Sequence, residues 1–305
     1  MLPVIDALQT AILPVFAALA LGYGLGWRGV LDRGDATAIN KFVILCALPA
    51  LLFGLVARAP LDQFNAAVML TYLASEVLVY GLGFALCYWV FRRPVLEALL
   101  LGMAACFANH VFFVYPIAQA VIGPEAALPV AAVMAMDAVV LYGATILLLD
   151  VVSAGRGSAV KIARQIGTNP LILSLAAGVL VNLSGIGLHD GVGQYVDFVG
   201  AATAPAALFA LGVMLSAVPL RRLEGATATT IGLKIIVHPI VFSGLAGLAG
   251  GTAALWTESV LLVAAGPCGA MPFVLALRYG IDPTLLMKAI LLSTTATVGT
   301  LALLA

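Results

Sequence analysis

Residues 49–53 read Pro-Ala-Leu-Leu-Phe, and residues 205–209 read Pro-Ala-Ala-Leu-Phe, 156 positions later. Further prolines repeat at the same offset: Pro14 with Pro170, and Pro116 with Pro272. Three matched prolines, one pair inside a nearly shared pentamer, indicate that the chain is an internal duplication. In a strongly apolar chain, a duplication with prolines at matched positions is typical of transporters with interrupted helices.

The composition predicts an integral membrane protein. Of 305 residues, 63% are hydrophobic and 9% charged, whereas a soluble domain has about 25% charged residues. Such a chain needs a lipid bilayer as its partner, and we expect the bacterial inner or another plasma membrane. Zero net charge gives no indication of a nucleic-acid partner. The four cysteines lie in apolar stretches and fit no zinc or redox motif, so we expect neither a metal nor a cofactor beyond a coupling H⁺ or Na⁺.

The apolar segments predict an all-α protein with ten membrane spans, and residues 3–27 are expected to be a retained span, not a signal peptide. The predicted spans are 3–27, 38–57, 65–90, 96–122, 128–150, 169–187, 197–217, 226–249, 255–278 and 284–304. Residues 1–150 would form the first five-helix repeat, residues 151–168 a cytoplasmic connecting loop, and residues 169–305 the second repeat. Because five is odd, the second repeat must be inverted in the membrane.

The positive charges divide between the two predicted faces. One face receives Arg28, Arg33, Arg92, Arg93, Arg156, Lys161, Arg164, Arg221, Arg222 and Arg278, with Lys41 close by. The other face receives only Arg58. Since loops rich in lysine and arginine stay cytoplasmic, both termini are predicted on the outer side. The oligomeric state stays open, and a homodimer is one arrangement that the sequence allows.

Two predicted spans carry helix-breaking sequences. Span four contains Asn109-His110-Val-Phe-Phe-Val-Tyr-Pro116, and span nine contains Gly266-Pro267-Cys-Gly-Ala-Met-Pro272. Irregular backbone at membrane depth is tolerated where it is buried in protein or lines a wet cavity. We therefore predict that helices four and nine are broken and cross, with half-helix amino termini that attract an anion. A simple proline kink in each packed helix is the alternative.

Ionisable side chains inside predicted spans are candidates for function. Glu76 and Lys234 occupy related depths in the two repeats, His238 lies one turn from Lys234, and Asp137 and His110 lie in spans five and four. Lys234 either attracts substrate, pairs with a carboxylate, or extends its amine to the membrane boundary. The acidic and histidine side chains either carry a coupling ion or form structural hydrogen bonds.

The chain resembles the auxin efflux carrier family, in the superfamily of bile, arsenite and riboflavin transporters. Bacterial members of this family include predicted malonate and malate permeases. Matching motifs run along the whole chain: Ile12-Leu-Pro-Val-Phe16, Arg28-Gly-Val-Leu-Asp32, Pro49 to Phe53, Asn169-Pro170, Pro205 to Gly212, Met271-Pro272 and Tyr279-Gly-Ile-Asp282. The resemblance implies two inverted five-helix repeats, a scaffold of spans one, two, six and seven, and an elevator movement of the other spans. The chain departs from the family at His110, Val111 and Val114, which predicts a bulkier, more apolar pocket.

The sequence thus predicts a secondary transporter of a small mono- or dicarboxylate, not an enzyme. The candidate substrate-binding residues are Asn109, His110, Pro116, Pro267, Pro272 and Lys234. The candidates for a coupling ion or proton are Glu76, Asp137, His110 and His238. Alternatives are a sodium-coupled carrier resembling the bile-acid symporters, a channel or receptor, and an intramembrane enzyme. The enzyme is disfavoured because no zinc-binding His-Glu-x-x-His or phosphate-binding Gly-rich motif occurs.

Overall fold

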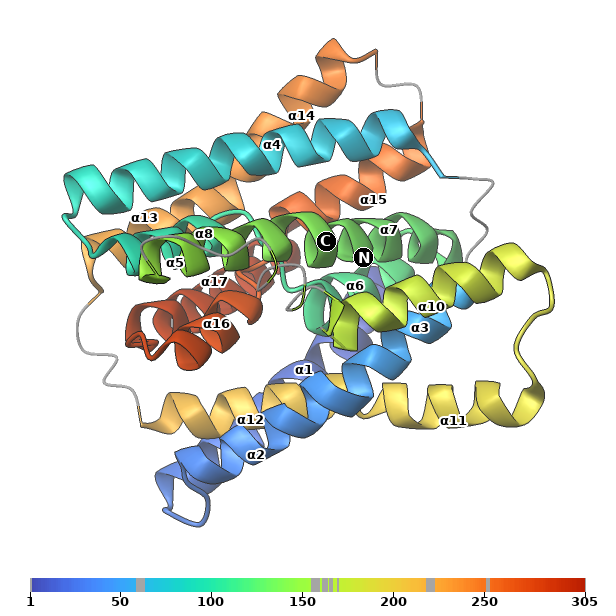
Figure 1. Cartoon of the computed structure of the whole chain (residues 1–305), viewed down its shortest axis with the longest axis horizontal. Helices are drawn as coiled ribbons and strands as arrows, with labels where there is room; N and C mark the ends of the chain where they lie inside the picture. The colour runs from blue at the N-terminus through green and yellow to red at the C-terminus, as the bar shows by residue number, and fades with distance from the viewer. Residues whose placement is uncertain are drawn as a thin grey trace. The chain divides into compact units, whose positions relative to one another are not determined.

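The computed structural model describes residues 2–58, 64–154, 160, 164, 167–168, 170–217, 223–250 and 253–304. Within these ranges the chain forms helices and connecting turns, with one isolated β-bridge and no strand (Figure 1). Contacts divide the chain into two units. Unit 1 holds Met1–Leu8, Asn65–Ser158 and Val218–Ala305, and unit 2 holds Gln9–Phe64 and Ala159–Ala217. Unit 2 holds predicted spans two, six and seven and span one from residue 9 onward, the spans that the family resemblance groups as a scaffold.

Unit 2 is built from helices at the start and middle of the chain. Its elements are most of α1 (Leu2–Trp27), α2 (Arg33–Phe42), the π-helical turn η1 (Val43–Ala47), α3 (Leu48–Ala57), α10 (Pro170–Ser184), α11 (Asp190–Ala201) and α12 (Thr203–Ser216). Helix α3 packs against α10 and α11, and α2 packs against α12 (Figure 1). Helices α1 and α12 approach closely at two glycines: a Cβ atom on Gly22 would overlap the carbonyl of Phe209, and one on Gly212 would overlap that of Leu19.

Unit 1 contains all the residues predicted for substrate and coupling. Its elements are α4 (Ala66–Ala85), η3 (Leu86–Val90), α5 (Val95–Ala104), η4 (His110–Val114), α6 (Tyr115–Val121), η5 (Pro124–Ala126), α7 (Ala127–Met136), η6 (Asp137–Leu141), α8 (Tyr142–Ala154), α13 (Gly225–Gly232), η7 (Leu233–Val237), α14 (His238–Leu248), α15 (Ala254–Ala265), α16 (Met271–Tyr279) and α17 (Thr284–Leu304). Helix α4 packs against α5 and α14 (Figure 1). The apolar core gathers around α5, which is buried over most of its length.

Three π-helical turns precede prolines that lie inside longer helical segments. Turns η1, η4 and η7 each end two residues before a proline: Pro49, Pro116 and Pro239, respectively. Proline has no N–H group and its ring clashes with the carbonyl four residues earlier, which here lies within the π-helical turn. The wider turn accommodates the proline without ending the helix, and such turns often occur at functional sites.

The helices follow the predicted spans closely but differ at several ends. The span predicted from residue 38 begins at Arg33, because Asp32 and Asp35 form a capping box at the amino terminus of α2. The span predicted from residue 197 begins with α11 at Asp190. By length and composition, four described segments could cross a membrane: Arg33–Ala57, Ala66–Val90, Asp190–Ser216 and Gly225–Leu248. Shorter apolar helices occupy much of the remaining predicted spans.

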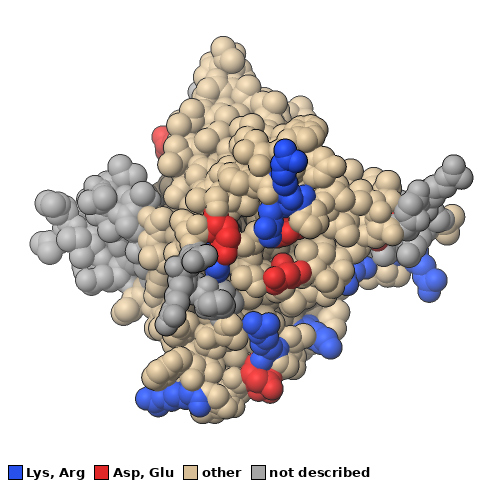
Figure 2. Space-filling model, turned by 90° about the vertical axis from the view of Figure 1, so that its left-hand side faces the viewer, with Lys and Arg blue, Asp and Glu red and all other residues tan. Residues whose placement is uncertain are grey.

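The surface has the apolar character expected of a membrane protein. Large hydrophobic side chains are widely exposed, including Phe198 at 83% and Leu248 at 87%. Figure 2 shows one face of the molecule, on which uncharged residues cover most of the surface and charged side chains form a few small groups. Some positions used in the sequence predictions lie outside the described residues. They are Arg156, Lys161, Asn169, Arg221, Arg222 and most of the connecting loop 151–168.

Candidate functional site

Two helical segments of unit 1 are interrupted. Residues 105–109 separate α5 from η4, and residues 266–270 separate α15 from α16. The two interruptions meet at an antiparallel β-bridge between Ala108 and Cys268. Two backbone hydrogen bonds join them: Asn109 N–H donates to the Pro267 carbonyl at 2.9 Å, and Gly269 N–H donates to the Phe107 carbonyl at 2.9 Å.

The sequence explains why α15 ends where it does. Pro267 has no N–H group, so the Val263 carbonyl has no donor four residues ahead. The Cys268 N–H, which would bond the Ala264 carbonyl in a continuous helix, donates instead to Ser293 Oγ at 3.0 Å. The Val263 carbonyl accepts from the Gly266 N–H at 3.1 Å, whereas the Ala264 carbonyl has lost its usual helix donor. Both carbonyls lie at the carboxyl end of α15, where the helix dipole favours a cation.

Lys234 supplies that cation from the π-helical turn η7. Its Nζ atom donates to the Ala264 carbonyl at 2.6 Å and to the Val263 carbonyl at 3.2 Å. Its third polar neighbour is His238 Nδ1 at 3.4 Å. The Lys234 side chain is completely buried. Among the ion pairs within 4.0 Å in the described chain, none includes Lys234, so a direct pair with Glu76 or Asp137 does not form in this structure.

The hydrogen bonds around His238 indicate which of its ring nitrogens carries hydrogen. The Ser75 hydroxyl donates to the Tyr72 carbonyl at 2.6 Å and lies 3.2 Å from His238 Nε2. With the hydroxyl proton directed to the Tyr72 carbonyl, the imidazole donates through Nε2–H to Ser75 Oγ. Nδ1 of the neutral ring is then an acceptor for Lys234, and the lysine needs three protons to reach its three acceptors. This pattern requires a charged ammonium group.

A second group of buried side chains consists of two carboxyls and a histidine. His110 Nε2 lies 2.9 Å from Asp137 Oδ2, with exposed fractions of 3% and 0%. Glu76 on α4 is also fully buried. It interacts electrostatically with Asp137 and Lys234, and it interacts with the Tyr72 side chain. His110 is the first residue of the π-helical turn η4 and Asp137 the first residue of η6, whereas Glu76 lies within α4.

The structure therefore places Glu76, His110, Asp137, Lys234 and His238 in the buried part of unit 1. Asn109 is 5% exposed and takes part in the joined interruptions through its backbone. Of the predicted prolines, Pro267 and Pro272 are buried at the second interruption, and Pro116 lies in the first turn of α6.

A small apolar cavity adjoins the second interruption. Its volume is about 20 Å³, and it is lined by Phe113, Val114, Ile117, Leu262, Ala265, Gly266 and Thr297. A space of this size holds about one water molecule. In the cavity wall, a methyl group of Val114 packs so closely against Gly266 that a side chain added at Gly266 would overlap it. Val114 is one of the departures from the family pattern, and the bulkier, more apolar substrate pocket expected from His110, Val111 and Val114 stays a prediction.

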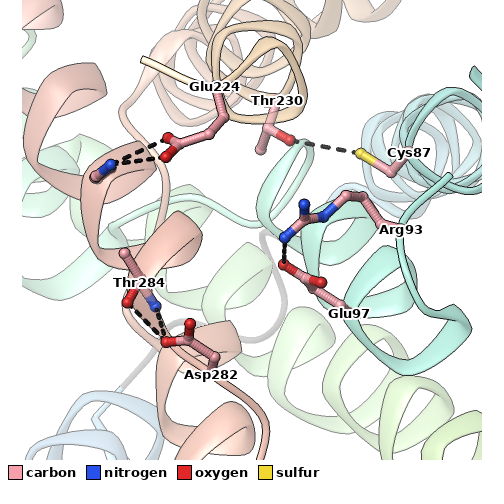
Figure 3. Close-up of polar contacts among 8 residues, drawn as sticks. Cys87, Arg93, Glu97, Glu224, Thr230, Asp282 and Thr284 are labelled. Carbon is pink, nitrogen blue, oxygen red and sulfur yellow. Dashed lines mark hydrogen bonds and ion pairs between the residues drawn. The ribbon is translucent and has the colours of Figure 1, made fainter. Parts of the chain in front are cut away.

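Several polar residues of unit 1 were not singled out from the sequence. Ser75 and Tyr72 have no signal beyond their place one residue and one turn from Glu76. Lys288 pairs with Glu224 at 2.9 Å, although it lies about one turn inside a predicted span. Figure 3 shows Glu224 in the same region as the Arg93–Glu97 pair, whose N–O distance is 2.7 Å. The Lys288 amine holds the pKa of the Glu224 carboxyl below its ordinary value.

Comparison with known proteins decides the family. A family model described as "Membrane transport protein" matches residues 7–162 and 156–305. The chain belongs to this family of membrane transport proteins. The match confirms the resemblance to the auxin efflux carriers.

Curated relatives extend over nearly the whole chain. A protein of Rhizobium meliloti (strain 1021) named "Putative malonate transporter" is 30% identical over 95% of this chain and 92% of its own length. An "Uncharacterized transporter" of Methanothermobacter thermautotrophicus is 27% identical over 93% of this chain and 92% of its own length. The "Uncharacterized transporter YfdV" of Escherichia coli (strain K12) is 24% identical, with 88% of each chain covered. The chain is therefore a membrane transporter.

Proposed function

We propose that the protein is a secondary transporter of a small mono- or dicarboxylate, with malonate as the first candidate. The observation that carries this proposal is the pair of hydrogen-bonded helix interruptions surrounded by buried ionisable groups. Helices η4 and α16 begin at these interruptions, and the first N–H groups of a helix have no partner within it. Such groups and the positive end of the helix dipole favour a carboxylate.

The proposed architecture is ten spans in two inverted five-helix repeats, with both termini outside the cell membrane. Unit 1 would move as the transport domain and unit 2 would stay as the scaffold, in an elevator-type cycle. The internal proline repeat and the division into two units support this assignment. The 20 Å³ cavity beside the interruption is too small for a dicarboxylate, so cargo binding there requires a rearrangement of the surrounding side chains or helices.

The buried acids suggest how transport is coupled to protons. Glu76 and Asp137 interact, and both are fully buried. Two buried, ionised carboxylates repel each other, so a proton on one of them stabilises the pair. We therefore assign Glu76, Asp137 and His110 as the proton-carrying group. Lys234 supplies positive field to the site but does not contact the cargo, because its donors are used.

Uptake of labelled malonate into proteoliposomes tests the cargo site. Asn109→Ala and Pro272→Ala should reduce uptake at least tenfold, because the first removes a buried polar side chain at one interruption and the second removes the buried proline that follows the other. The matched control is Glu258→Gln, which alters an exposed side chain on α15 and should leave uptake unchanged. Uptake at the wild-type rate in both test variants would refute the site. Asp137→Asn should remove the stimulation of uptake by an inward proton gradient.

A further inference from the structure

Lys234 lies where a free cation would otherwise bind. Its ammonium group fills a buried position between two consecutive main-chain carbonyls at the end of α15, and a neutral imidazole completes its surroundings. The helix ends here at Pro267, and the Cys268 N–H donates to Ser293 in place of the Ala264 carbonyl. The Val263 carbonyl accepts from both Lys234 and the Gly266 N–H. Carbonyl oxygens of this kind are ordinary ligands for monovalent cations as well as for ammonium groups.

The charges around this position also favour a cation. Glu76 and Asp137 interact electrostatically with Lys234, and the carboxyl end of α15 adds the negative end of a helix dipole. The titratable neighbours from the surrounding elements are Glu76 on α4, Asp137 at η6, His238 on α14, and the cysteines Cys106 and Cys268. None of these is a competing fixed cation.

We infer that the Lys234 ammonium is a tethered cation in a latent small-cation site, and that replacing it with a short side chain opens this site to free monovalent cations. The covalently held charge keeps the broken end of α15 satisfied at all times. The wild-type protein then needs no sodium at this position, which separates it from a carrier that must bind sodium there. The inference goes beyond the proposed cargo and holds whichever anion is carried.

Thermal unfolding of the purified full-length protein without any organic anion gives the test. Lys234→Ala removes the equivalent of propylammonium, so propylammonium chloride, sodium chloride and choline chloride are compared at equal ionic strength. Lys234→Ala should unfold several degrees below wild type in choline. Its Tm should rise with the logarithm of the propylammonium concentration, because a ligand that binds only the folded state stabilises it. The wild-type Tm should be the same in all three salts.

Two further variants keep the test decisive. Lys234→Met fills the space with an apolar chain and should show a lowered Tm that no cation restores. Lys234→Gln retains N–H donors without charge, so a wild-type Tm in this variant would overturn the need for a cation. A Lys234→Ala protein that responds equally to all three salts would also overturn the inference. So would a wild-type protein that sodium stabilises over choline. Because no readout involves transport, failure of the cargo assignment would leave these results unaffected.

Discussion

Gly269 is the position at which one added methyl group should separate the two helix interruptions. A Cβ atom there would overlap the Ala108 carbonyl oxygen and lie 2.8 Å from Phe107 Cε1. Real Cβ atoms essentially never approach a neighbour closer than 3.0 Å. The obstacle includes main chain, so it cannot be relieved by rotating a flexible side chain. Gly269→Ala must therefore push the interruption of α15 and α16 away from that of α5 and η4.

The expected cost follows from the contacts that are lost. The displacement breaks the hydrogen bonds from Asn109 to Pro267 and from Gly269 to Phe107, each contributing about 1 kcal/mol. Insertion of a methyl group into a packed interior typically costs about 1–3 kcal/mol more. Together these effects predict a destabilisation of about 3–5 kcal/mol. For a protein of this size, that corresponds to a decrease in Tm of roughly 6–10 °C.

Intrinsic-fluorescence unfolding of purified protein measures this decrease, and proteoliposome uptake shows whether transport falls with it. Gly244→Ala is the matched control, because Gly244 lies on α14 of the same unit and a Cβ atom there meets nothing within 4 Å. The control should stay within about 1 kcal/mol of wild type, since alanine is the better helix former. A Gly269→Ala protein with wild-type Tm and uptake would refute the close contact between the interruptions.

Two further predictions concern packing and pH. Gly22→Ala should lower the Tm, because the added methyl group would overlap the Phe209 carbonyl. Gly24→Ala, on the same helix, should leave the Tm unchanged, because a Cβ atom there meets nothing within 4 Å. Equal Tm values for the two variants would contradict the packing of α1 on α12. The pKa of Glu224 is lowered by its pairing with Lys288. The pair therefore stabilises the folded protein fully at pH values above 4.5, the carboxyl's ordinary pKa, and this stabilisation is lost as the pH falls through the lowered pKa. Unfolding from pH 7 to pH 3 should therefore show a Tm difference between wild type and Glu224→Gln that disappears at the acidic end; a difference independent of pH would argue against the ion pair.

The sequence predicted much of the fold because apolar length and proline are strong local signals. Long apolar stretches fixed most helices to within a few residues, and Pro267 indicated the interruption that the structure shows in its segment. The exceptions arose where polar residues extend a helix beyond the apolar stretch. Asp32 caps α2, which begins at Arg33, five residues before the predicted start of that span. Helix α11 begins at Asp190, before the span predicted from residue 197, in a segment of modest hydropathy.

The site was harder to predict because it depends on distances between elements. The sequence indicated that Lys234 matters but could not show which groups its amine would reach. The end of another helix decides this, because the Cys268 N–H beyond α15 donates to Ser293 and leaves the Ala264 carbonyl to the Lys234 amine. The role of Ser75 likewise depends on its neighbours: one hydroxyl proton, donated to Tyr72, determines which nitrogen of His238 carries hydrogen. Both sets of contacts join residues that are far apart in the sequence, so no short sequence motif predicts them.

The charge of the Lys234 ammonium group bears on the proposed coupling of anion transport to protons. Among the described side chains of unit 1, Glu76, Asp137 and Lys234 are 0% exposed, and they interact electrostatically with one another. An uncompensated charge buried in protein is costly, so one ammonium can balance only one carboxylate. The second carboxyl must be neutral, or His110 must carry a proton beside Asp137 at 2.9 Å. In the proposed coupling, this proton already balances the second carboxyl. An arriving carboxylate would add one further negative charge, so the proposed cycle brings a second proton into the site together with the anion.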